Sequence, residues 1–131
     1  MKPLFQGIYN HFNTVNSLNT ALSGRLYLFE ADPQSSLPFC TYSLISNDPD
    51  FIFSAELTNP LIQFSLYSDS ESADEVTTNY GYLIALFDDA AITVTGYSTV
   101  EFRRSQARLF REPETNLWTY QVDYEIILSK T

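Results

Sequence analysis

The sequence predicts an α+β fold: an antiparallel or mixed β-sheet with two helices packed on one face and a long C-terminal β-hairpin. Two observations support this class. Apolar residues recur at steps of three or four in two segments, which is the period of a helix, and at steps of two in most others, which is the period of a strand. The segments run helix, four strands, helix, three strands, an order that favours helices laid on one face of a sheet. The chain of 131 residues fits one domain, residues 1–131.

Residues 4–22 form the first expected helix. Apolar residues along this segment are spaced for one helix face: Phe5, Ile8, Phe12, Val15, Leu18 and Leu22. Pro3 suits a helix start, and Gly24 suits a helix end. The asparagine and threonine residues within the segment are weak helix formers, so we expect the helix to break near residues 13–17 and then to resume briefly.

Four strands are expected next, over residues 25–31, 39–46, 51–57 and 61–68. In two of them apolar and polar residues alternate: Cys40, Tyr42 and Leu44 against Thr41 and Ser43, and Ile62, Phe64 and Leu66 against Gln63, Ser65 and Tyr67. Residues 32–38 are predicted to be a loop and residues 47–50 a turn, because proline, serine and aspartate gather there. We expect these strands to form an antiparallel meander.

The second helix is expected after residues 69–75, where a candidate N-cap serine and several acids precede an apolar face. That face contains Val76, Tyr80, Leu83, Ile84 and Phe87. Gly81 lies inside the helix and costs about 1 kcal/mol relative to alanine, a cost that a close approach of the helix backbone to the sheet would offset. Asp88 and Asp89 are unfavourable near a helix C-terminus and mark its end.

Three strands are expected in the last part of the chain, over residues 91–95, 98–110 and 117–129. The final strand alternates most regularly, with Trp118, Tyr120, Val122, Tyr124, Ile126 and Leu128 on one face and Thr119, Gln121, Asp123 and Glu125 on the other. We therefore expect one buried face and one wet face. The alternation of the preceding strand becomes irregular after Phe102, which indicates a bulge or a projecting hairpin. A projecting hairpin favours a subunit contact, and packing within the domain is the alternative.

Composition and charge argue against several classes of protein. Seven basic residues against 16 acidic residues give a net charge of −9, which argues against a polybasic nucleic-acid binder. The single cysteine, Cys40, cannot form an internal disulfide, and Cys40 and His11 are too few for a typical metal site, so we expect a reducing compartment. Polar residues interrupt every apolar run well before the roughly 20 residues that span a bilayer. We therefore expect a soluble protein made in the cytosol, with no membrane partner.

The residues do not indicate catalysis or a cofactor. The chain lacks a phosphate-binding glycine-rich loop and a Gly-x-Ser-x-Gly elbow. A nucleophile–base pair would have to combine Cys40 or a serine with His11, but Cys40 shares a strand face with Tyr42, which favours a buried thiol. His11 lies next to Phe12, a residue of the apolar helix face, and is interpreted as a surface or boundary histidine. The acidic residues have local uses at turns and helix ends, so a paired-carboxylate site, or cation binding by residues 48–50, is the weaker interpretation.

The least ordinary feature is a cluster of arginines on the expected strand 98–110 and at its end. Four of the seven basic residues lie there: Arg103, Arg104, Arg108 and Arg111. Arginine pairs with carboxylates in a bidentate geometry and is enriched at protein interfaces. We therefore hypothesise that these four residues form a subunit interface. The alternatives are a solvated strand face that pairs with Asp123 and Glu125 on the neighbouring strand, and a contact with DNA.

Several local phrases, taken in order, resemble a known family. They are Gly24-Arg25-Leu26-Tyr27 after the first helix, Leu37-Pro38-Phe39-Cys40-Thr41-Tyr42, Gln63-Phe64-Ser65-Leu66-Tyr67-Ser68, the helix over residues 72–89, and an arginine-bearing strand before the final strand. This organisation resembles the tail terminator (tail completion) proteins of long-tailed bacteriophages. The resemblance covers nearly the whole chain.

The resemblance implies a structural virion protein of the tail or neck, with neither an enzymatic activity nor a cofactor. It implies a hexameric ring that caps the tail tube, ends tube polymerisation and joins the tail to the head, with the tail tube protein and a head–tail connector or stopper protein as partners. DNA would pass through the lumen without specific binding. The runner-up hypothesis is a connector or stopper of the neck. From a different class, the alternative is a monomeric α+β ligand-binding domain or a small hydrolase that uses carboxylates.

Overall fold

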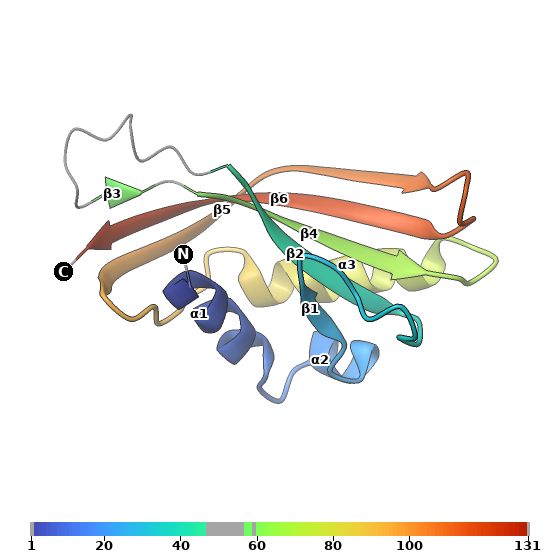
Figure 1. The fold of residues 1–131 in the computed structure, drawn as a ribbon, viewed down its shortest axis with the longest axis horizontal. Coiled ribbons are helices and arrows are strands. Elements are labelled where there is room, and N and C mark those ends of the chain that lie inside the picture. The colour runs from blue at the N-terminus through green and yellow to red at the C-terminus, as the bar shows by residue number, and fades with distance from the viewer. Residues whose placement is uncertain (1, 47–56, 59, 131) are drawn as a thin grey trace.

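Three helices cover one face of a mixed β-sheet in the computed structural model, which describes residues 2–46, 57–58 and 60–130 (Figure 1). The elements follow in the order α1 (Lys2–Phe12), α2 (Ser17–Leu22), β1 (Leu26–Leu28), β2 (Phe39–Ser46), β3 (Leu57–Thr58), β4 (Leu61–Ser68), α3 (Asp74–Phe87), β5 (Tyr97–Arg111) and β6 (Trp118–Lys130). The α+β class is confirmed. The helices number three because the first expected helix is divided into α1 and α2.

The sheet is ordered β1-β2-β4-β6, with β5 on the free side of β6 and the short β3 on the same side of β6 as β4. The predicted antiparallel meander is wrong in one respect, because β1 runs parallel to β2 with Leu26 opposite Cys40. A parallel neighbour needs a connection that returns the chain to the starting end of the strand, and the loop of residues 29–38 provides it. The two edges of the sheet are therefore β1 and β5.

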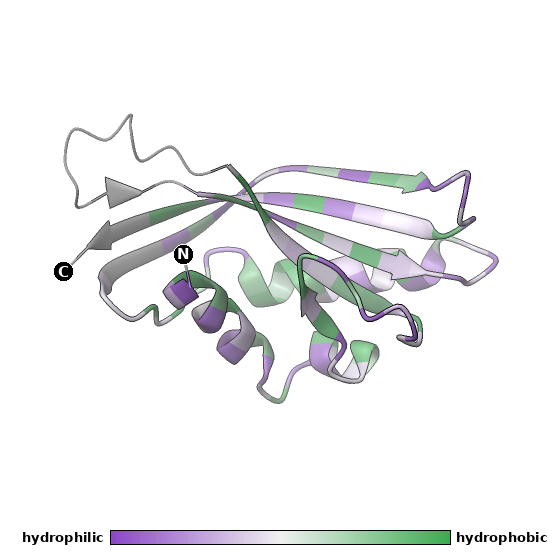
Figure 2. Cartoon of the chain, in the orientation of Figure 1, coloured by the Kyte–Doolittle hydropathy of each residue, from purple (hydrophilic) through white to green (hydrophobic). Residues whose placement is uncertain are grey.

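The strands with alternating sequences have the predicted bounds. β2 and β4 span 39–46 and 61–68 as expected, and Figure 2 shows hydrophobic and hydrophilic residues alternating along the long strands. β1 is shorter than its predicted range of 25–31. The strand predicted over residues 51–57 lies outside the described residues except for Leu57, which belongs to β3.

An asparagine produces the break between α1 and α2. The Asn16 side chain accepts a hydrogen bond from the Asn19 N–H at 2.8 Å and donates one to the Phe12 carbonyl at 2.9 Å. It thus caps the start of α2 and the end of α1 together. Ser23, in the left-handed region with φ of 51°, ends α2. The interruption predicted at residues 13–17 is confirmed, as is the position of the end beside Gly24.

The start of α3 differs from the prediction of a serine N-cap. The cap position is Ala73, which has no side-chain hydrogen bond. Ser72, one residue before the cap, accepts a 3.3 Å hydrogen bond from the Asp74 N–H. Asp74 and Glu75 lie in the first turn, where the helix dipole favours negative charge. Glu75 also accepts a 2.6 Å hydrogen bond from the buried Ser68 hydroxyl at the end of β4. Acidic residues and a tertiary bond therefore fix this helix start in place of a local cap.

Residues 91–95, predicted to be a strand, are not one. Ile92 and Val94 are buried and alternate as a strand would, but the segment packs against α1 instead of pairing with the sheet. The close approach occurs at Gly7, where an added Cβ would lie 2.7 Å from the Thr93 carbonyl oxygen and 3.0 Å from a Val94 methyl. Residues 91–95 are extended and buried on one side only, so their apolar residues alternate as in a strand although the segment does not pair with the sheet.

The core lies between the helices and the sheet. A cluster of aromatic rings forms its centre, with Phe87 of α3 located 4.8 Å from Phe64 and 5.7 Å from Phe102 between ring centroids. Tyr124 stands edge-on to Phe64. The Tyr124 hydroxyl donates a 2.6 Å hydrogen bond to Asp88, and burial, followed by this bond, raises the pKa of Tyr124. The polar end of the largest buried ring is thus satisfied just beyond the end of α3.

Candidate subunit interface

The β5–β6 hairpin pairs along its whole length, from Tyr97 opposite Lys130 to Arg111 opposite Trp118. The register shifts between Arg104 and Gln106, so Ser105 is an extra residue on β5. This is the bulge that the irregular pattern after Phe102 predicted. Because one residue is inserted, Phe102 and Arg108 lie on opposite faces of the sheet although they are six positions apart.

Strand alternation divides the four arginines between the two faces of the sheet, and the bulge at Ser105 decides which of them share a face. Arg104 and Arg111 lie opposite Tyr124 and Trp118, which belong to the helix-covered face. The other two, Arg103 and Arg108, lie opposite Glu125 and Gln121 on the open face. The structure therefore does not gather the four predicted interface residues into one patch.

Arg104 is occupied within the subunit. Its guanidinium donates a 2.7 Å hydrogen bond to the Tyr80 hydroxyl and forms a 3.4 Å ion pair with Asp88. The Tyr80 ring is stacked on Tyr120 at 4.0 Å between centroids. These contacts join β5, α3 and β6 beside the Tyr124–Asp88 hydrogen bond. Arg104 thus serves the packing of α3 on the sheet.

Arg103 and Arg108 are exposed on the open face. Arg103 forms a 2.9 Å ion pair with Glu101 on its own strand, and this hydrogen bond and charge raise the pKa of Arg103. Arg108 donates a 2.9 Å hydrogen bond to Gln121 and lies 5.0 Å from the Phe110 ring centroid. An exposed ion pair contributes little to stability, so both guanidinium groups are available to a partner.

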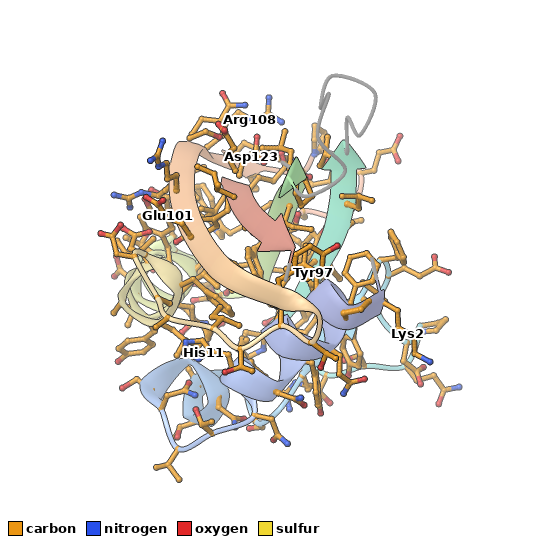
Figure 3. All side chains as sticks on the ribbon, turned by 90° about the vertical axis from the view of Figure 1, so that its left-hand side faces the viewer. Lys2, His11, Tyr97, Glu101, Arg108 and Asp123 are labelled. Atoms are coloured by element: carbon orange, nitrogen blue, oxygen red, sulfur yellow. The ribbon has the colours of Figure 1, made fainter. Side chains whose placement is uncertain are left out.

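Asp123 does not pair with an arginine in the described residues. Its two carboxylate oxygens accept hydrogen bonds from the Gln63 and Gln106 amides, each at 2.9 Å. Together with Arg108 and Gln121 these side chains surround a polar hollow of about 140 Å³, on the side of the sheet where Figure 3 places Arg108 and Asp123. The alternative in which the arginines pair with Asp123 is therefore wrong, whereas Arg103 lies opposite Glu125 on the neighbouring strand.

The face of β6 predicted to be wet is only partly so. Thr119 is 2% exposed and Asp123 is 7% exposed, although neither lies under a helix. Long side chains on the neighbouring strands cover Asp123, as the bonds from Gln63 and Gln106 show. Glu125 is exposed as predicted. A central strand in a wide sheet thus buries polar residues on its open face, which alternation alone does not predict.

The two residues considered as a nucleophile–base pair are separated. Cys40 is fully buried on β2, and burial raises the pKa of its thiol. His11 bonds through Nε2 to the Leu86 carbonyl at 2.9 Å and packs against Phe87. In the residues that the structure describes, no group of three or more metal-ligating side chains is present. A search of the same residues found no helix that is both long enough and apolar enough to cross a membrane.

Burial predicts that the Cys40 thiol does not react while the protein is folded. We expect dithiobis(nitrobenzoate) to leave the native protein unmodified over hours and to label one thiol per chain in denaturant, because the reactive thiolate is disfavoured and inaccessible. A Ser36→Cys variant, with a thiol in the exposed loop, should react at once and provides the control. Labelling of native Cys40 as fast as the Ser36→Cys thiol would contradict its placement in the core.

The fold and the sequence were compared with known proteins. A chain in a structure described as "Virion of native gene transfer agent (GTA) particle" has the same fold, with a TM-score of 0.66 and 12% identity over 95% of this chain and 92% of that one. No curated protein matches the sequence. A family model described as "Tail completion protein gp17" matches residues 6–129.

These findings define a structural protein of the bacteriophage virion. The chain belongs to the tail completion protein gp17 family. The resemblance inferred from the local phrases and their order is therefore confirmed.

Proposed function

We propose that this protein forms a hexameric ring that caps the tail tube, ends tube polymerisation and joins the tail to the head. The match of the tail completion family to residues 6–129 is the observation that supports this proposal most directly. The protein would act through its surfaces, without a cofactor or an enzymatic activity. Its place would be the junction of tail and neck in the virion.

The free edge of the sheet supports self-assembly. β5 spans 97–111, and within the described residues its only strand partner is β6. Its other long side has no strand partner among those residues, although the Asp89 N–H donates a 3.4 Å hydrogen bond to the Phe102 carbonyl. An exposed edge strand is a template for pairing with another chain, and charged side chains on such an edge restrict which chain can approach. Arg103 and Arg108 are such charged side chains on β5, so this edge would accept an acidic partner and repel a basic one.

The mechanism of termination would be geometric. A ring made by head-to-tail contacts has two different faces. One face would match the last ring of the tail tube, and the other would offer no site for a further tube subunit and would receive the neck protein. Addition of tube subunits then stops because the capped end of the tube no longer presents the surface to which a tube subunit binds.

The charge of the chain fits a passage for DNA. At a net charge of −9, a lumen lined by this protein would repel phosphate groups more than it attracts them. Genome movement needs such a weak interaction, because each phosphate contact adds affinity.

The test is the phenotype of particles that lack the protein. We expect loss of the gene product to give overlong tails or tails without heads, and we expect the wild-type protein supplied in trans to restore normal particles. The purified protein, alone or mixed with purified tail tube, should form rings visible by electron microscopy. Tails of normal length without heads would favour a neck connector instead. A strict monomer in both conditions would overturn the proposal, above all if it bound a small ligand.

A further inference from the structure

The two edges of the sheet differ in charge. The β5 edge presents Arg103 and Arg108 on its open face. The opposite edge, β1, leads into a loop whose acidic residues, Glu30 and Asp32, are both exposed. Arg25 is the single basic residue of segment 25–46, and its guanidinium is occupied by a 2.9 Å hydrogen bond to the Pro38 carbonyl. The β1 edge is therefore acidic, whereas β5 carries more arginines than acids, with Arg103 paired to Glu101 on the same strand.

The end of β1 and Arg108 of β5 lie at the same level across the sheet, and Arg103, opposite Glu125, lies three cross-strand rows away. The cross-strand row that contains Leu28 at the end of β1 runs through Tyr42, Phe64 and Val122 to Ala107 of β5. Arg108 adjoins Ala107, while Phe29 and Glu30 follow Leu28. In a closed ring, each copy is related to the next by a rotation about the ring axis, with no shift along that axis. When the strands run along that axis, the end of β1 in one copy meets the arginine-bearing part of β5 in the next.

An exposed aromatic residue lies beside the acids. Phe29 is 57% exposed and has φ of 69°, a left-handed conformation that bulky residues rarely adopt. Its N–H bonds to the Tyr42 carbonyl at 2.8 Å, and its ring stands edge-on to Phe5. Together with Leu28, 38% exposed, it makes an apolar anchor of the kind found at the centre of interfaces. Leu109 follows Arg108 in sequence but lies opposite Tyr120 on the helix-covered face, where it is 39% exposed and supplies an apolar counterpart.

We propose that the β1 end of one copy, formed by Leu28, Phe29, Glu30 and Asp32, binds the β5 edge of the next copy. Glu30 and Asp32 pair with Arg103 and Arg108 across the contact, and the apolar side chains are covered between them. This pairing rests on the proposed ring, since it is the contact that closes it. Two β5 edges cannot replace it, because their arginines would face each other.

Charge reversal tests the pairing. The variant Arg103→Glu/Arg108→Glu should weaken the contact about a hundredfold, about tenfold for each reversed pair, and should form no rings in conditions where the wild type does. Adding Glu30→Arg and Asp32→Arg to this variant should restore the rings. The control combines the two arginine reversals with Asp69→Arg and Glu71→Arg, which are exposed acids in the turn before α3. Both fourfold variants have the wild-type net charge of −9.

Mass in solution and electron microscopy give the result, with circular dichroism to confirm that each variant is folded. Rescue by the β1 changes and not by the control supports the pairing. Rings that persist in the arginine variant, or rescue by both fourfold variants or by neither, overturn the pairing and leave the proposed ring intact. A wild-type protein that forms no ring, alone or with tail tube, overturns the proposed function and the pairing with it.

Discussion

Replacing Phe87 with alanine should lower the free energy of unfolding by about 3 to 5 kcal/mol, the range for removing a buried aromatic side chain. Phe87 is fully buried at the end of α3, and its ring contacts those of Phe64, Phe102 and His11. The neighbouring strands are fixed by their hydrogen-bond ladders, so the space left behind cannot close. Denaturant unfolding followed by tryptophan fluorescence measures the loss.

Tyr82→Ala is the matched control for Phe87→Ala. Tyr82 lies on the same helix but is 37% exposed, and its removal should change stability by less than about 1 kcal/mol because surface substitutions have small effects. Equal losses in the two variants would show that the aromatic cluster is not the centre of the core. A Phe87→Leu variant, which retains apolar volume, should recover part of the loss and remains folded if Phe87→Ala does not.

Two helical glycines should respond in opposite directions to the same substitution. Gly81→Ala should raise the free energy of unfolding by up to about 1 kcal/mol, because alanine favours the helix and an added Cβ at this exposed site meets nothing within 4 Å. Gly7→Ala should lower it by about 1 to 3 kcal/mol, since the Cβ would lie 2.7 Å from the Thr93 carbonyl oxygen and overpack the contact.

Each glycine is the control for the other. Both variants gain the same helix propensity, so the difference between their unfolding free energies isolates the clash at Gly7. If Gly7→Ala were as stable as Gly81→Ala, residues 91–95 would not pack closely against α1. The prediction from sequence that a close approach to the sheet offsets the cost of Gly81 is wrong, and the close approach occurs at Gly7 instead.

The spacing of apolar and polar residues in the sequence correctly predicted several helices and strands. Alternation placed β2 and β4 within their observed bounds, and the weak helix formers between Asn13 and Ser17 predicted the break that Asn16 makes. The regular alternation of β6 reflects one face packed on helices. In these cases the period of the sequence and the burial of the side chains have the same cause.

Features that depend on tertiary neighbours were not predictable in this way. The extended segment 91–95 has the period of a strand because α1 covers one side of it, and a parallel β1 gives the same local pattern as an antiparallel one. The arginine cluster was found from composition, but which of the arginines share a face depends on which residue bulges. Glu30 and Asp32 gave no signal, because two acids in a loop are common and only the sheet order places them at the opposite edge.

The inserted residue at Ser105 divides β5 into a part before the bulge and a part after it. A bulge increases local twist and bends its strand, so the part of β5 before it follows the subunit's own core while the part after it leaves in a new direction. Deleting Ser105 would keep every later pair with β6, change that direction and remove the 3.3 Å hydrogen bond from the Ser105 hydroxyl to the Asp123 carbonyl. In a closed ring the turn from one copy to the next determines how many copies fit. The curvature of the assembly would then depend on one residue that contributes no side chain to the contact.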